Sequence, residues 1–171
     1  TPVASGEAMF SSCLSEPAAG SDAVSMSTRA VRDGDHWVLN GVKRWITNAG
    51  VSDFYTVMAV TDPDARSRGI SAFVVPAGTT GLTIAERIEV IAPHPLARLE
   101  FAGCRVPADA LLGAVGEGFK LAMRTLDIFR ASVAAAALGF ARRALHEALG
   151  RAHERKMFEA TLADLPLALA L

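Results

Sequence analysis

The 171-residue sequence is poor in the residue types that mark several protein classes. It holds only two cysteines, Cys13 and Cys104, which lie far apart and form no CxxC pair. This argues against a disulfide framework, and we expect reduced thiols in a cytosolic-type protein, with one disulfide as the alternative. The four histidines show no metal-ligand spacing, so we expect no metal site; they are His36, His94, His146 and His153.

The sequence also lacks a charge excess of either sign and a long hydrophobic run. Seventeen Lys and Arg residues face eighteen Asp and Glu residues, for a net charge of -1, so no basic face for nucleic acid and no acidic disordered tail is expected. The longest run of small apolar residues, 133–141, is too short and too rich in alanine to span a bilayer. No signal-peptide pattern opens the chain. We expect a cytoplasmic protein, or one of the mitochondrial matrix if eukaryotic.

Both ends of the sequence are unusual. The chain begins at Thr1 and ends at Leu171 in an apolar run with no helix stop signal after it. We therefore expect a fragment, or the truncated product of a longer gene.

Apolar residues make up 51% of the chain, enough for a buried core. Up to Pro107, turn residues separate short stretches rich in Val, Ile, Phe and Tyr, which predicts an antiparallel β-barrel or sandwich. Asp33-Gly34-Asp35 and Asn40-Gly41 are expected to form hairpin turns, and 62–69 a loop. The predicted strands are 26–32, 36–40, 42–47, 54–60, 70–76, 82–90 and 98–106.

After Pro107 the hydrophobic period changes to that of helices. We expect a short helical turn over 108–113, a helix over 117–128 and a long helix over 130–157. The last carries Leu138, Leu145 and Leu149 on one face. Asp164 is expected to cap a further helix with Pro166 in its first turn. The sequence thus predicts an α+β protein in which a β domain precedes helices.

One segment, 12–22, is dense in chemically useful residues. Pro17 restricts its own backbone and that of Glu16, and Gly20 permits close approach of a ligand. Ser15 and Ser21 supply hydroxyl groups. Composition alone is explained equally well by a surface turn with a Ser or Asx cap.

Three blocks of sequence carry a resemblance to a known family: 12–22, then 44–50 (Arg-Trp-Ile-Thr-Asn-Ala-Gly), and finally 116–120 with 126–130. In order and spacing they resemble the two flavin-contact segments and the start of the C-terminal helical domain of the acyl-CoA dehydrogenase family. The resemblance covers essentially the whole chain. It implies a middle β domain at 1–112 and the first part of an incomplete four-helix bundle at 113–171. The family's N-terminal domain and later helices have no counterpart in the sequence.

The resemblance implies an FAD cofactor and particular ligand residues. Ser15 would bond the flavin ring, and Ser21 would contact the CoA side or the FAD pyrophosphate. Asp127 and Arg130, with Ser21, would bind substrate, although an exposed i,i+3 ion pair explains the first two equally well. The implied cofactor-binding residues are Cys13, Leu14, Ser15, Ser21, Trp45, Ile46, Thr47, Arg155 and Phe158. Without the resemblance, Trp45 and Thr47 form an ordinary sheet pair, and Arg155 is a partner for the helix dipole.

Family members dehydrogenate acyl-CoA thioesters, and the resemblance implies an acyl-CoA substrate, an electron-transfer flavoprotein-type acceptor and a homo-oligomer, tetramer or dimer, when complete. The sequence departs from the family at Glu159, where a Gly is usual, and at Leu165-Pro166, where a Gln is typical. No catalytic base of either family type is present, since Phe129 occupies the minority position. We therefore expect this chain alone to be inactive. The alternatives are a fragment of an acyl-CoA oxidase or related flavin monooxygenase, and a non-catalytic module that binds acyl-CoA or a partner.

Overall fold

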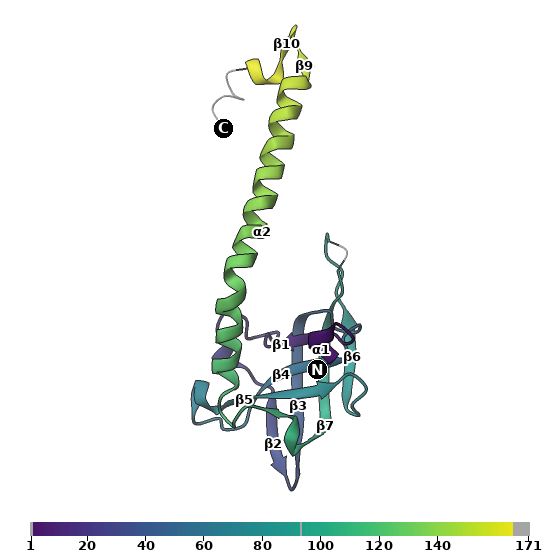
Figure 1. The fold of residues 1–171 in the computed structure, drawn as a ribbon, viewed down its shortest axis with the longest axis vertical. Coiled ribbons are helices and arrows are strands. Elements are labelled where there is room, and N and C mark those ends of the chain that lie inside the picture. The colour runs from purple at the N-terminus through teal and green to yellow at the C-terminus, as the bar shows by residue number, and fades with distance from the viewer. Residues whose placement is uncertain (1, 93, 166–171) are drawn as a thin grey trace. The chain divides into compact units, whose positions relative to one another are not determined.

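The structure is a computed structural model that describes residues 2–92 and 94–165. Its contacts group the chain into two compact units, Thr1–Arg124 and Thr125–Leu171. The first unit is built on a β-sheet, and helix α2, Gly118–Glu154, continues from it into the second unit (Figure 1). The predicted α+β class, a β domain followed by helix, is confirmed.

The first unit contains one eight-stranded sheet in the order β6-β7-β3-β2-β4-β5-β8, with β1 paired to β4. Short 3-10 turns η1, η2 and η3 join the strands at Ala23–Ser25, Arg66–Gly69 and Ala108–Ala110, and a single helical turn α1, Pro2–Ser5, precedes them. The strands are β1 Phe10–Cys13, β2 Arg29–Asp33, β3 His36–Thr47, β4 Phe54–Val60, β5 Ile70–Pro76, β6 Leu82–Arg87, β7 Leu96–Pro107 and β8 Leu111–Leu112.

Most strand pairs are antiparallel, as expected, but β4 has two parallel neighbours on one edge. β1 pairs with its first half, from Phe10 opposite Phe54, and β2 meets its end, where Arg29 lies opposite Val60. Strand β1 was not predicted, because its four residues are stabilised by a partner strand 44 residues further along the chain and not by a local turn.

The core lies between the two halves of this sheet. Side chains of β3 and β7 pack against those of β4 and β5, and the rings of Trp37 and Phe73 meet with centroids 5.3 Å apart. Leu39, Val57 and Leu99 are completely buried in the same cluster. The sheet therefore encloses its own core, in the manner of a barrel or sandwich.

The expected hairpin at Asn40-Gly41 is wrong. Strand β3 runs through this dipeptide and stays paired with β7 on both sides, through Leu39 and Gly41, with a bulge between them. Gly41 has φ of 151°, and a Cβ there would lie 2.4 Å from the Thr28 hydroxyl oxygen. Glycine is used here for close packing and not for a turn.

In the helical region, too, one continuous element replaces two predicted ones. A single helix, α2, replaces the two expected at 117–128 and 130–157, because no proline or capping residue separates them. Its start packs tightly on the sheet: a Cβ on Gly118 would lie 2.4 Å from the Ser71 carbonyl carbon. The expected turn at 108–113 is the 3-10 turn η3 followed by β8.

A small hairpin follows α2 in the second unit. It joins β9, Lys156–Met157, to β10, Ala160–Thr161, and leads into η4, Leu162–Asp164. The further helix that Asp164 was expected to cap lies outside the described residues. Asp164 itself is the third residue of η4, and its carboxylate accepts hydrogen bonds from the backbone and hydroxyl of Thr161. Pro166 lies outside the described residues.

Candidate functional site

The structure brings two of the predicted ligand segments together. The Ser11 hydroxyl donates to the Thr47 carbonyl at 2.7 Å, and the Arg44 amide donates to the Ser15 carbonyl at 3.0 Å. Residues 11–15 therefore run alongside 44–47 in the opposite direction. Residues separated by about thirty positions in the sequence share one surface.

Glu16 holds the first segment in a turn. Its backbone and that of Ala19 exchange hydrogen bonds at 2.9 and 3.2 Å. The Glu16 side chain is buried, and its carboxylate accepts hydrogen bonds from the Ser27 amide and hydroxyl and from the Thr28 amide. The turn and the segment leading into β2 are thus fixed to each other.

A buried ion pair links this turn to β3. Lys43 Nζ lies 2.8 Å from Glu16 Oε1 and donates to the Leu14 carbonyl at 3.1 Å. Burial alone raises the pKa of the Glu16 carboxyl, but the Lys43 ammonium and the hydrogen bonds outweigh it and lower the pKa to about 2. Burial lowers the pKa of Lys43, and the Glu16 carboxylate opposes that effect. The Glu16 carboxylate is therefore ionised, and its oxygens are engaged by Lys43, Ser27 and Thr28.

Trp45 is held in an unusual conformation beside this pair. Its φ is 63°, in the left-handed region, and it sits in a bulge of β3 with 52% of its surface exposed. The Arg44 guanidinium lies 4.9 Å from the centre of its ring. A large aromatic residue with positive φ is strained, and such strain concentrates at functional sites.

The predicted ligand residues differ in what they can offer. The hydroxyls of Ser15, Ser21 and Thr47 have no hydrogen-bond partner within residues 2–92 and 94–165. Cys13 and Ile46 point into the core, so only their backbone can meet a ligand. Burial raises the pKa of the Cys13 thiol to about 12, which excludes it as a nucleophile at neutral pH. Leu14 is half-buried.

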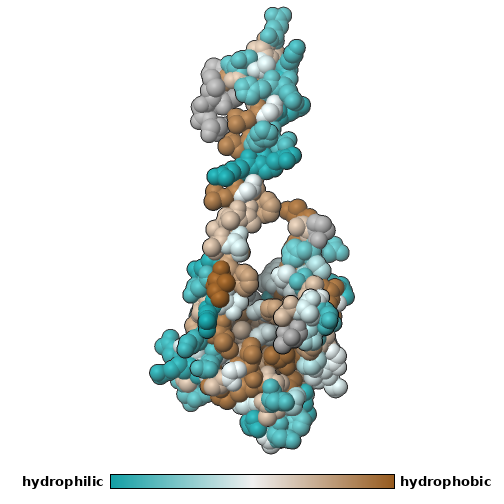
Figure 2. All heavy atoms as spheres, in the orientation of Figure 1, coloured by the Kyte–Doolittle hydropathy of each residue, from teal (hydrophilic) through white to brown (hydrophobic). Residues whose placement is uncertain are grey.

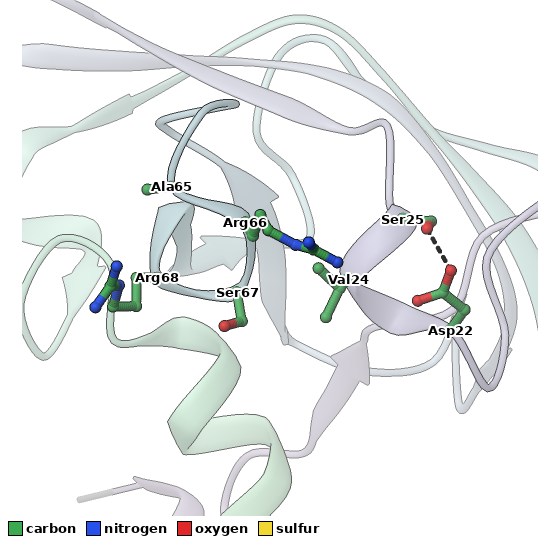
Figure 3. Close-up of a pocket in the computed structure, with 7 residues that line it drawn as sticks. All are labelled: Asp22, Val24, Ser25, Ala65, Arg66, Ser67 and Arg68. Atoms are coloured by element: carbon green, nitrogen blue, oxygen red, sulfur yellow. Dashed lines mark hydrogen bonds between the residues drawn. The ribbon is translucent and has the colours of Figure 1, made fainter.

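A cavity of about 490 Å³ opens next to Ser21, between η1 and η2. Figure 3 shows Arg66 reaching toward Val24, Arg68 on the other side of the same loop, and Asp22 turned toward Ser25, to which it is hydrogen-bonded. Two guanidinium groups at one opening suit an anionic ligand such as a phosphate. The cavity lining is Asp22, Val24, Ser25, Ala65, Arg66, Ser67 and Arg68.

The remaining predicted ligand residues lie in the second unit. Asp127 and Arg130 form an exposed ion pair at 3.7 Å on α2. Arg155 follows the helix directly, and Phe158 is 87% exposed at the turn of the β9–β10 hairpin. Both central residues of this turn have positive φ, 49° for Phe158 and 69° for Glu159. The Glu at 159 therefore occupies a conformation that glycine adopts without strain.

Two further carboxylates of the first unit are also engaged. Glu100 pairs with Arg98, and the Glu117 side chain accepts a hydrogen bond from the Ala114 amide before α2. Phe129, at the minority base position of the family, is 58% exposed. Glu16, Glu100 and Glu117 therefore each have a partner among the described residues.

Sequence reasoning missed three residues of this region. Lys43 directly precedes the block 44–50, but nothing in that stretch of sequence indicates that its side chain is buried. Arg66 and Arg68 were assigned to a loop, although two arginines beside a glycine were a usable signal. Within the described residues, no group of three or more side chains could hold a metal ion, and no helix is long and apolar enough to cross a membrane.

Comparison with known proteins identifies the family. A model described as "Acyl-CoA dehydrogenase, middle domain" matches residues 11–104, and one described as "Acyl-CoA dehydrogenase, C-terminal domain" matches 116–169. The chain therefore belongs to the acyl-CoA dehydrogenase family.

Individual relatives agree. The chain is 52% identical over 153 residues to the probable acyl-CoA dehydrogenase FadE25 of Mycobacterium tuberculosis, covering 88% of this chain and 39% of that protein. It is 46% identical over 167 residues to the human mitochondrial short-chain specific acyl-CoA dehydrogenase, covering 96% and 40%. The chain thus spans about 40% of the length of these relatives.

A solved structure shows the same fold. It is titled as an electron transferring flavoprotein of Acidaminococcus fermentans studied for flavin-based electron bifurcation, and it matches with a TM-score of 0.88 and 41% identity. The match covers 99% of this chain and 45% of that one.

Proposed function

We propose that the complete protein is an FAD-dependent acyl-CoA dehydrogenase and that this chain supplies its flavin-facing surface. The observation that carries the proposal is the surface shared by residues 11–15 and 44–47, with a strained, exposed Trp45 and two hydroxyls free to bond a ligand. A flat aromatic ring system with polar edges suits such a surface, because the indole offers a stacking face and the hydroxyls offer hydrogen bonds.

The residues present fit FAD. Ser15 and Thr47 are the hydroxyls that would bond the flavin ring, and Trp45 and Ile46 would contact it alongside, with Cys13 and Leu14 presenting backbone. When bound, FAD accepts the hydride that leaves the β carbon of the substrate. The chain's own contribution is to orient the ring and to exclude water from one face. Arg155 and Phe158 are proposed as contacts to the FAD of a neighbouring subunit.

The cavity between η1 and η2 is the proposed place for the CoA end of the substrate. Its two arginines, Arg66 and Arg68, complement phosphate charge, and Ser21 lies beside its rim residue Asp22. Asp127 and Arg130 are proposed to bind substrate as well. For this they would have to exchange their own ion pair for contacts to the ligand.

The domain division, partners and location complete the proposal. We assign 1–112 to the family's middle β domain and 113–171 to the first part of its C-terminal helical domain, supported by the two family matches. An electron-transfer flavoprotein-type acceptor, a homo-oligomeric state, and a cytoplasmic or mitochondrial-matrix location accompany this assignment. The mitochondrial human relative supports the location in the eukaryotic case.

Reaction with oxygen separates dehydrogenase from oxidase. A dehydrogenase that holds acyl-CoA should reduce its flavin without consuming oxygen. Its flavin should be reoxidised only when an electron acceptor is added. Rapid oxygen uptake in the absence of an acceptor would instead favour an acyl-CoA oxidase or a related monooxygenase.

The flavin surface is tested by Thr47→Ala in the complete protein. Loss of one hydrogen bond to the ring, worth about 1 kcal/mol, should weaken FAD binding about 5-fold. Thr80→Ala, in the exposed turn between β5 and β6, serves as the matched control and should bind FAD like the wild type. A wild-type protein that binds no FAD would overturn the proposed function. Unchanged affinity in Thr47→Ala alone would remove only Thr47 from the site.

A further inference from the structure

Lys43 is the one lysine among the buried residues of the chain's described part, and it lies between the two segments of the candidate flavin surface. Its side chain is 0% exposed and that of its partner Glu16 is 2% exposed. Neither charged group can touch a ligand on the surface. Any influence on the ligand must pass through the backbone that the pair holds.

A gain in folding stability is by itself a weak explanation for a buried ion pair such as Lys43–Glu16. Taking two charges out of water costs free energy that their attraction often fails to recover, and well-packed apolar substitutes are frequently no less stable. Buried ion pairs are better explained where they select one arrangement of the surrounding backbone.

The contacts of Lys43 point to such a selection. Its ammonium donates to the Leu14 carbonyl and to the Glu16 carboxylate and approaches the Met26 sulfur at 3.8 Å. The Glu16 carboxylate in turn binds the backbone of Ser27 and Thr28. One lysine thus fastens the turn at 14–16, the entry to β2, and its own strand β3 to one another.

The fastened segments are those that carry the candidate ligand residues. The Leu14 carbonyl immediately precedes Ser15, and Trp45 and Thr47 follow Lys43 by two and four residues. The Arg44 amide, next to Lys43, holds the Ser15 carbonyl. We propose that Lys43 is a positioning residue that sets the Ser15 hydroxyl relative to Trp45 and Thr47, so that both segments can bond one ligand. This inference rests on the proposed function.

The test separates positioning from stability in the complete protein, using FAD as the probe. Lys43→Met leaves the Leu14 carbonyl without its donor and the Glu16 carboxylate without its counter-ion. We expect FAD affinity to fall about 10-fold or more, the visible absorption of bound flavin to shift, and the melting temperature to fall. The double variant Glu16→Gln/Lys43→Met removes both charges. It should regain most of the melting temperature but not the affinity, because Leu14 still lacks its donor.

Val106→Ala is the stability control. Val106 is buried opposite Trp37, at the other end of β3 from the candidate surface. This variant should lower the melting temperature without changing the flavin spectrum or the affinity. The proposal is overturned if FAD affinity follows melting temperature across all three variants, or if Lys43→Met binds FAD with wild-type affinity and spectrum. A wild-type protein that binds no FAD would overturn the proposed function, and this inference with it. If the wild type binds FAD but one of the two results above is found, only the positioning role of Lys43 is refuted and the proposed function stands.

Discussion

At the scale of single residues, Glu16 shows why chemical type alone could not assign a role. In the sequence it is an acidic residue in a loop, and acidic side chains are common general bases. The structure surrounds its carboxylate with a lysine ammonium, two backbone amides and a hydroxyl. A carboxylate with a pKa of about 2 is a poor proton acceptor at neutral pH, and it acts instead as a brace.

This arrangement predicts a pH dependence of stability. The pKa of Glu16 falls from an ordinary 4.5 to about 2 on folding, so its ionised form stabilises the fold above about pH 5. The contribution, about 3 kcal/mol, is lost as pH falls from 5 toward 2, because the unfolded chain takes up the proton first. Denaturant unfolding of the complete protein at several pH values should show the wild type losing its advantage over Glu16→Gln in this window.

Glu7→Gln, which removes an exposed carboxyl, should follow the wild type at every pH and controls for general acid effects. A wild-type advantage over Glu16→Gln that stays constant down to pH 3 would show that Glu16 is not held ionised by Lys43.

Glu159 gives a second prediction at this scale. The left-handed backbone conformation of Glu159 destabilises the folded state by about 1–2 kcal/mol, because its Cβ is crowded by the backbone. Glycine has no Cβ and avoids this strain, although it raises the conformational entropy of the unfolded chain. Glu159→Gly should therefore stabilise the β9–β10 hairpin by about 0.5–1 kcal/mol. Slower hydrogen exchange at the amide of Ala160, which lies opposite Met157 in the hairpin, would register the gain. Glu159→Ala removes the same charge but keeps the Cβ and should show no gain; equal protection in both variants would assign the effect to charge.

At the scale of elements, the sequence predicts best what local chemistry determines. β4 and β5 begin and end at the predicted residues, because apolar stretches there are bounded by strong turn formers. The hairpin predicted at Asn40-Gly41 is wrong because the same dipeptide suits a hairpin turn and a β-bulge. Only the pairing of β3 with β7 decides between the two. The contact between 11–15 and 44–47 joins distant segments, so neither it nor the Lys43–Glu16 pair could be derived from spacing.

Helix α2 carries the prediction at this scale. Its apolar residues Leu138, Leu145 and Leu149 are 59%, 60% and 52% exposed in the described chain, and Figure 2 shows hydrophobic atoms along the helix surface. We expect this face to pack on other helices in the complete protein. The 171-residue chain alone should therefore self-associate. Sedimentation velocity should show species larger than the monomer, reduced by Leu138→Gln/Leu145→Gln.

Arg151→Gln, on the face of the same helix opposite the three leucines, should leave that association unchanged. A clean monomer over a range of concentration and salt would mean that the apolar face needs no partner.

At the scale of the whole molecule, the described residues hold the proposed flavin surface and the cavity lined by Arg66 and Arg68, while the three carboxylates Glu16, Glu100 and Glu117 each have a partner. Two of the candidate FAD contacts, Arg155 and Phe158, lie in the second unit, and the others lie in the first unit with the three carboxylates. Thioester α-protons are weakly acidic, so a carboxylate must be held against them. The proposed reaction is therefore divided between this chain and residues beyond it.

The last prediction is that the proton abstractor of the complete protein is a Glu downstream of Leu171, as the family resemblance implies. Glu117→Gln and Glu100→Gln should retain exchange of the α-protons of a bound acyl-CoA, since their carboxylates serve the start of α2 and an ion pair. Replacing the downstream Glu by Gln should abolish exchange. Adding Phe129→Glu to that variant should restore part of it, because the family's minority members carry their base at this position. NMR of the bound thioester in deuterated water measures the exchange directly. If Glu117→Gln abolishes exchange while FAD stays bound, the base lies within these 171 residues and the division of the reaction is wrong.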